Sequence, residues 1–460
     1  MLRNRIVTSL AFASACAGTL AAQDPSRAAA LDRALAELPP AQGSPTVATP
    51  SGSRDLGNLG PFKLLDLSFD LLIAGGASTE RDSALGDLQA GGHDPRKRGF
   101  TLQNAELSLQ GAVDPYFRTD LHLITFVDPI EGETVVELEE AFATTTCLPE
   151  LTGIDGLELE IGQFQTEFGR QNPRHPHEWD FLDAPVIHTR VFGPDGMRGQ
   201  GLRLGWLTPL PWFSELHFGV QNAAGETMAS FLANEEFFAE RAIGGRLFNE
   251  REVHALSDLA WLARFVNAFE PCDTLSVQLG LSSLFGPNAS GNGTATTIAG
   301  ADLVVRYSDD VGGRQANELV WQTEFVTRAY ETDEFVDEGD PLDPGDDVTV
   351  PGETLDDWGV VTQLTWRFAP KWRSGLRLDH ASGSGAGYDA DARVIAARDD
   401  DPFRNDRTRI SPLLEWSPSH FSRVRLQYNW DDAATLDDGV AHSVWLGGEF
   451  AIGAHGAHRF

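Results

Sequence analysis

The stretch Ala441-His-Ser-Val-Trp-Leu-Gly-Gly-Glu-Phe-Ala-Ile-Gly-Ala-His-Gly-Ala-His-Arg-Phe460 decides the fold class. Apolar side chains occupy alternate positions, with Gly448 completing the row: Val444, Leu446, Phe450, Ile452 and Ala454. The intervening positions carry a different set: Trp445, Gly447, Glu449, Gly453 and His455. This period of two indicates a β-strand with two unlike faces. Outer-membrane barrels close with such a strand and a final aromatic residue. We therefore expect an all-β fold, a transmembrane antiparallel β-barrel, with Phe460 as the signal for the barrel-assembly machinery.

Composition excludes several other classes of protein. After residue 20, no apolar run approaches the roughly 20 residues that a transmembrane helix needs. The slightly negative mean hydropathy suits a barrel whose strands alternate between lipid and water. The net charge of −33 argues against nucleic acid as a partner.

The first 60 residues are expected to lie outside the barrel. Residues 1–22 read as a signal peptide for Sec-type export, with an apolar stretch at 6–20. Cys16 leaves a lipoprotein signal open as the alternative. Residues 23–60 form a Pro/Ala-rich periplasmic linker with a short helix as one option. The barrel itself is assigned to 61–460, in the outer membrane.

Alternating patterns predict about 16 strands. Their ranges are 62–74, 99–113, 117–127, 135–145, 157–164, 198–207, 214–222, 259–269, 274–285, 297–307, 319–330, 358–369, 372–381, 408–417, 422–430 and 441–455. Very short connections follow strands 2, 8, 12 and 14, and long ones follow strands 1, 5, 7, 11 and 13. This asymmetry predicts short periplasmic turns and long extracellular loops.

Two places break the alternation. Phe100 and Leu102 would point into the lumen, and Glu140 would point to lipid. A β-bulge, or a subunit contact that covers Glu140, accounts for such a break. The subunit contact is one reason to expect a homotrimer.

Charged residues predicted to face the lumen separate by sign. The acidic group comes from the first five strands: Asp66, Asp70, Glu106, Glu137, Glu139, Glu158 and Glu160. The basic group comes from strands 12, 13 and 15: Arg367, Arg373, Arg377, Arg423 and Arg425. Opposed charged walls that line a pore favour polar solutes. A simple need for water around these side chains is the alternative.

Potential metal ligands are dense in one long loop, 165–197. His175, His177 and Glu178 offer imidazole and carboxylate donors of the kind that Zn²⁺ uses. His455 and His458 form a second His-x-x-His pair. Polar residues that pack a constriction are the alternative explanation, so no metal is assigned.

Several stretches resemble the phosphate-selective porin O/P family and related outer-membrane porins. They run from Gly99 to Gly111, from Gly162 to Arg170, from Trp416 to Tyr428 and from Gly453 to Phe460. The resemblance implies a barrel in the outer membrane, and some relatives carry labels that suggest zinc-linked uptake. Phosphate-selective members place basic residues at the constriction, whereas the long loops before strands 6, 8 and 12 of this chain are rich in Asp and Glu.

We predict a porin for passive diffusion of small hydrophilic solutes or ions. The alternatives are a zinc-linked uptake channel and, in another class, a structural or adhesive barrel plugged by its loops. We expect no cofactor and no enzymatic activity, since the sequence has no nucleophile elbow, zinc-protease motif or P-loop. Outer-membrane lipid and lipopolysaccharide would be the other partners.

Overall fold

The computed structural model describes residues 65–129, 131–146, 148–309, 317–338 and 346–453. The signal peptide at 1–22, the linker at 23–60, the pair His455 and His458, and the assembly signal Phe460 lie outside these residues. Among the described residues, no helix is long and apolar enough to cross a membrane.

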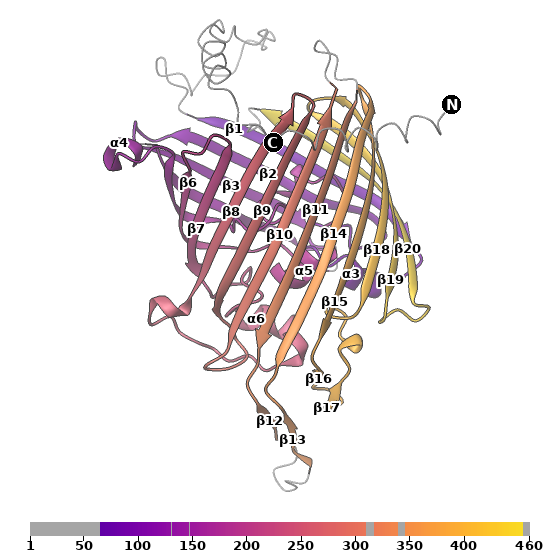
Figure 1. Ribbon diagram of the computed structural model, residues 1–460. Helices are drawn as coiled ribbons and strands as arrows, with labels where there is room; N and C mark the ends of the chain where they lie inside the picture. The colour runs from indigo at the N-terminus through magenta and orange to yellow at the C-terminus, as the bar shows by residue number, and fades with distance from the viewer. Residues whose placement is uncertain (1–64, 130, 147, 310–316, 339–345, 454–460) are drawn as a thin grey trace, which may run out of the picture.

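Sixteen antiparallel strands form a closed barrel, as the sequence predicts (Figure 1). They are β1 (Asp66–Ser78), β2 (Gly99–Ala112), β3 (Phe117–Val127), β4 (Thr134–Thr145), β5 (Leu157–Gln165), β6 (Arg198–Leu207), β7 (Phe213–Asn222), β8 (Leu259–Cys272), β9 (Leu275–Pro287), β10 (Ala295–Ser308), β11 (Glu318–Glu331), β14 (Thr354–Ala369), β15 (Trp372–Ser384), β18 (Arg407–Ser419), β19 (Ser422–Ala433) and β20 (Val440–Gly453). Each strand pairs with its neighbour in sequence, and β20 closes the sheet on β1 with Leu72 opposite Glu449.

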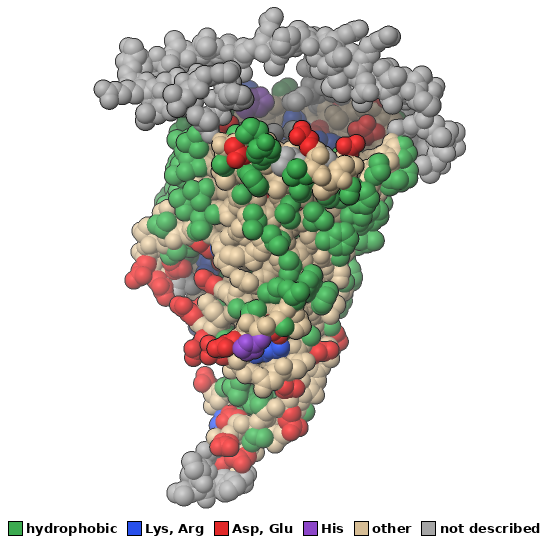
Figure 2. All heavy atoms as spheres, turned by 90° about the vertical axis from the view of Figure 1, so that its left-hand side faces the viewer, with side chains coloured by type: hydrophobic (Ala, Val, Ile, Leu, Met, Phe, Trp, Pro, Cys, Tyr) green, Lys and Arg blue, Asp and Glu red, His purple; other side chains and the backbone are tan. Residues whose placement is uncertain are grey.

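The closing strand has the two faces that its sequence predicts. Ile452 is 69% exposed on the outer face, whereas Trp445 is fully buried on the inner face. Exposed apolar side chains recur in the same phase on the other strands. Figure 2 shows hydrophobic side chains over the upper and middle exterior, with Asp and Glu at the upper rim and again over the narrower lower part. The described exterior therefore offers an apolar surface suited to lipid.

Connections at the two ends of the barrel differ in length. Short turns join β2 to β3, β8 to β9, β14 to β15 and β18 to β19. The long connections hold two small hairpins, β12 (Phe335–Asp337) with β13 (Val348–Val350) and β16 (Gly387–Asp389) with β17 (Val394–Ala396). The short helices are α3 (Asp82–Leu88), α4 (Leu148–Thr152), α5 (Val186–Phe192) and α6 (Glu235–Glu240), with one-turn 3-10 helices η2 (Pro176–Glu178), η3 (Ile243–Gly245), η4 (Leu256–Asp258) and η6 (Arg398–Asp400).

Two β-bulges correct the expected directions of three side chains. In β2 the pairing with β1 skips Gln103, which turns Phe100 outward, where it is 88% exposed, and puts Leu102 on the outer side as well. In β4 the pairing with β3 skips Glu139, which leaves Glu140 inside the barrel and only 8% exposed. The bulge explanation is confirmed, and the inward Glu140 no longer supports a covered subunit contact.

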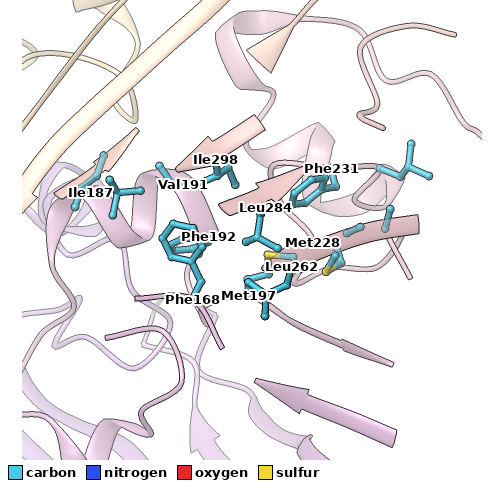
Figure 3. Close-up of a cluster of buried hydrophobic side chains, with 14 of the residues drawn as sticks. Phe168, Ile187, Val191, Phe192, Met197, Met228, Phe231, Leu262, Leu284 and Ile298 are labelled. Carbon is cyan, nitrogen blue, oxygen red and sulfur yellow. The ribbon is translucent and has the colours of Figure 1, made fainter. Parts of the chain in front are cut away.

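An apolar core lies inside the barrel (Figure 3). Phe168 and Phe192 of the connection between β5 and β6 pack there with Phe231 of the connection between β7 and β8. Inward side chains of the wall complete it, including Leu284 and Ile298. Long loops thus fold into the lumen and bury apolar surface against the strands.

Candidate functional site at the lumen loop

Residues 166–197, here called the lumen loop, contact the barrel wall on three sides. The backbone N–H of Arg170 donates to Glu324 of β11 at 3.0 Å. His175 lies 3.0 Å from Glu140 of β4. The N–H of Leu182 donates to Gln427 of β19 at 2.8 Å. Because these strands stand far apart around the barrel, the lumen loop crosses the lumen.

Histidines of the lumen loop meet carboxylates of the wall in a group that we call the histidine–carboxylate cluster. Its members are Glu106, His122, Glu139, Glu140, His175 and His177. Nδ1 of His175 lies 2.7 Å from Oε2 of Glu139 and 3.5 Å from Oε2 of Glu106. Nδ1 of His177 lies 2.9 Å from Oε2 of Glu106, and Nδ1 of His122 lies 2.9 Å from Oε1 of that residue. Glu106 is thus shared by three imidazoles.

The bulge in β4 builds this cluster. Successive residues of a regular strand point to opposite faces, whereas the bulge lets Glu139 and Glu140 both point inward. Their carboxylates contact the two ring nitrogens of His175. One extra residue therefore supplies two acids to one histidine.

The carboxylates control the protonation of the lumen-loop histidines. Burial alone lowers the pKa of His175, but Glu139 and Glu106 outweigh burial and raise the pKa well above its usual range. Burial likewise lowers the pKa of His177, and Glu106 outweighs it, so that the pKa rises to about 9. The raised pKa values favour the protonated form of these imidazoles, whose positive charge balances the buried acids.

Two triads of described residues have ligand atoms within 4.8 Å of one another: Glu106, His122 and His175, and separately His93, Glu137 and Asp195. Of the three sequence candidates, His175 and His177 enter the cluster. Glu178 instead lines two water-accessible cavities. The sequence did not single out His122 or His93, because neither stands in a ligand-rich segment.

The basic group does not form a water-exposed wall, which corrects the expectation of an open lumen between charged walls. Arg377 is 1% exposed and donates to Asp183 of the lumen loop at 2.6 Å. Arg425 is equally buried and donates to the carbonyl of Trp179 at 2.9 Å. Arg373 pairs with Asp180 at 2.6 Å, and Arg423 contacts Glu449 and the carbonyl of His177. Arg367 pairs with Glu318 at 3.1 Å and is partly exposed.

Most members of the acidic group have a basic side chain close by. Arg198 pairs with Glu137, and Arg203 pairs with Glu160. Glu158 lies 3.7 Å from Arg118, with both side chains nearly half exposed. Asp66 and Asp70 lie on the inner face of β1, and Asp70 is buried. The lumen loop stands between the two groups and supplies counter-charges to both.

Two cavities adjoin the lumen loop near the strand ends that carry the short turns. One has a volume of about 520 Å³ and is lined by Glu158, Arg174 and Phe213, among others. The other has a volume of about 300 Å³ and is lined by Asp70, His122 and His177, among others. Both are lined by Glu167, Pro173, Glu178 and Arg203. Two further cavities, lined in part by other residues of the lumen loop, have volumes of only about 20 and 30 Å³.

Comparisons with known proteins give one curated relative. An uncharacterized protein of Aquifex aeolicus (strain VF5) is 29% identical over 432 residues, covering 86% of this chain and 80% of the relative. No protein-family model matches the chain, so membership of the phosphate-selective porin family is not confirmed.

Solved structures of low sequence identity also match. The outer membrane channel DcaP of Acinetobacter baumannii is 10% identical, with a TM-score of 0.48 over 84% of this chain and 97% of that chain. OprB of Pseudomonas putida is 10% identical, with a TM-score of 0.47 over 84% and 94%. An anion-selective porin from Comamonas acidovorans is 10% identical, with a TM-score of 0.46 over 85% and 98%. The fold assignment rests on the strand pairing of the chain itself.

Proposed function

We propose that the chain is an outer-membrane channel through which small hydrophilic solutes or ions diffuse passively, narrowed by the lumen loop. The observation that carries this proposal is the closed sixteen-strand barrel with an apolar exterior and charged, water-accessible cavities inside. A barrel removes sheet edges, so its backbone is satisfied in lipid, while its interior remains available to water. Export by the Sec route, a homotrimeric assembly and the absence of enzymatic activity stay predictions.

The cavities favour small solutes that carry charge or several hydroxyl groups. The larger cavity is lined by residues of both signs, including Glu158, Glu215 and Arg174. Such a lining can form hydrogen bonds with a polar solute. An apolar solute would displace water from these charged side chains without replacing the hydrogen bonds that the water made. Solutes would then have to pass the lumen loop, which sets the size limit.

A second candidate is a barrel closed by its own loops. The apolar core around Phe192 and Phe231, and two small cavities lined in part by the lumen loop, favour it. A cavity of about 20–30 Å³ holds about one water molecule, which is too little for a solute. The two candidates differ only in whether solutes or ions pass through the barrel.

Swelling of liposomes in sugars of increasing size separates the two candidates. Vesicles that contain the purified protein should swell in the smallest sugars and progressively less in larger ones. Vesicles prepared with heat-denatured protein serve as the control. Absence of swelling in the smallest sugar, with the protein correctly folded, would favour the closed barrel and contradict the channel.

A further inference from the structure

We propose that the histidine–carboxylate cluster binds one divalent transition-metal ion of the Zn²⁺ type, with Glu106, His122 and His175 as its ligands. The three residues come from β2, β3 and the lumen loop. A bound ion would therefore tie the lumen loop to the barrel wall. Whether solutes cross the barrel does not affect this proposal.

The spacing of the donor atoms suits such an ion. Zinc–nitrogen bonds of about 2.0–2.1 Å in a tetrahedral site place neighbouring ligand atoms about 3.3 Å apart. The oxygens of Glu106 lie 2.9 Å from Nδ1 of His122 and 3.5 Å from Nδ1 of His175. One ligand atom from each residue falls within 4.8 Å of the other two. Adjustments of the side chains alone would close these distances around an ion.

The hydrogen bonds of His175 indicate which nitrogen faces the ion. Nε2 lies 3.0 Å from Oε2 of Glu140, a contact that orients the ring. Histidines that bind metals are commonly held in this way by a carboxylate on the opposite ring nitrogen. Nδ1 then points toward Glu106 and Glu139. Although Nδ1 lies 2.7 Å from Oε2 of Glu139, both atoms are buried without a hydrogen bond among the described side chains. An ion bound to Nδ1 of His175 would satisfy that nitrogen, and its charge would attract the neighbouring carboxylate of Glu139.

The cluster is open to ions from solution. Glu106, His122 and His175 line the cavity of about 300 Å³ beside the lumen loop. That cavity lies toward the short-turn end of the barrel, so an ion can arrive without crossing the apolar core. Imidazole donors favour Zn²⁺ over Mg²⁺ and Ca²⁺, which prefer oxygen ligands.

The test is titration of the untagged, full-length protein in detergent with ZnCl₂ by isothermal calorimetry. We expect one Zn²⁺ per chain, and no comparable binding of MgCl₂. His122→Gln and His175→Gln should each weaken the binding by at least about tenfold, since the loss of a supporting residue alone costs 10–100-fold. Heat-modifiable migration on a gel checks that each variant has folded. His122 is partly exposed, so its variant stays informative if His175→Gln misfolds.

Three matched variants serve as controls. His217→Gln removes another inward histidine that lies beside a carboxylate, Glu215. His93→Gln removes the histidine of the second triad, and His455→Gln with His458→Gln removes the pair near the C-terminus. All three should bind Zn²⁺ as the native protein does. The proposal is overturned if the native protein binds no Zn²⁺, if His122→Gln binds it unchanged, or if only a control variant loses it.

Discussion

Replacing Asp183 with Asn should release the lumen loop from the wall. Oδ1 of Asp183 accepts hydrogen bonds from Arg377 at 2.6 Å and Gln427 at 2.8 Å. Oδ2 accepts from Arg409 at 3.0 Å and Asn429 at 2.7 Å. The carboxylate is fully buried, so water cannot take its place. The side-chain amide of Asn would place its NH₂ group opposite two of these four donors, and those two donors would then have no acceptor.

The expected cost is about 3 kcal/mol. Removing one partner of a buried ion pair costs about 3–5 kcal/mol, because the other charge stays buried. The lower value applies here, since Arg377 keeps Asp379 at 2.8 Å and Arg409 keeps Asp431 at 2.8 Å. The barrel keeps its strand pairing, so the cost should appear as local opening of residues 166–197 rather than as global unfolding.

Hydrogen exchange measured by mass spectrometry gives this local free energy. Peptides from the lumen loop should exchange about 150-fold faster in Asp183→Asn, which corresponds to about 3 kcal/mol. Peptides from β8 to β10 should exchange as in the native protein. Asp432→Asn, which alters an exposed acid on β19, is the control. A change below about fivefold would refute the anchoring of the loop by Asp183.

The same experiment carries a pH dependence. Burial alone raises the pKa of Asp183, but Arg377 and Arg409 outweigh burial and hold the pKa below its usual range. Because the pKa of Asp183 is lower in the folded state than in the unfolded state, its ionisation stabilises the fold at pH values above the unfolded-state pKa of about 3.9. This stabilisation is lost as the pH falls from there toward the folded-state pKa. The difference between native and Asp183→Asn protein should therefore be constant near neutrality and shrink below about pH 3.9.

Three further changes have expected outcomes. Gly162→Ala should lower the yield of folded barrel, because the new Cβ would lie 2.2 Å from the carbonyl oxygen of Ala141 and Gly162 has a φ of +141°. Gly293→Ala is the control, since its Cβ would have no neighbour within 4 Å. Equal yields of the two variants on heat-modifiability gels would contradict this. Phe192→Ala should cost the lumen core about 3–5 kcal/mol, measured as faster exchange in α5, and unchanged exchange would exclude a packed core. If the barrel conducts, Glu158→Gln with Glu215→Gln should shift its ion selectivity toward anions at low salt, because two negative charges leave the cavity lining. The shift should vanish at 1 M salt, where the Debye length is about 3 Å. A reversal potential that stays unchanged at low salt would mean that ions do not pass these acids.

The alternation of side chains was sufficient to predict the strands. Positions such as Leu446 and Trp445 face opposite sides with nothing needed beyond the strand period, and sixteen such segments account for the barrel. The first strand was predicted to end too early, since it continues to Ser78 rather than stopping at residue 74. The bulge at Glu139 could be suspected from the broken pattern, but its position depends on the register with β3.

The site was only partly predictable. His175 drew attention because potential ligands crowd its segment, and Glu106 and Glu139 were assigned to the lumen correctly by phase. Their meeting depends on the fold of the lumen loop, which the local pattern does not contain. The prediction that the basic group lines an open pore was wrong for the same reason. Arg377 pairs with Asp183, which lies 194 positions away in the sequence, and the strand period carries no information about such a distant contact. Facing the lumen therefore did not mean facing water.

Conductance of single molecules across a planar lipid bilayer tests the central claim most directly. The native protein should give discrete conductance steps, and a variant with a Gly/Ser linker in place of residues 173–180 should give larger ones, because the segment that crosses the lumen is then removed. A native protein that inserts and shows no steps, while the shortened variant conducts, would mean that the loops close the barrel. Equal steps from both proteins would contradict the placement of the constriction at the lumen loop.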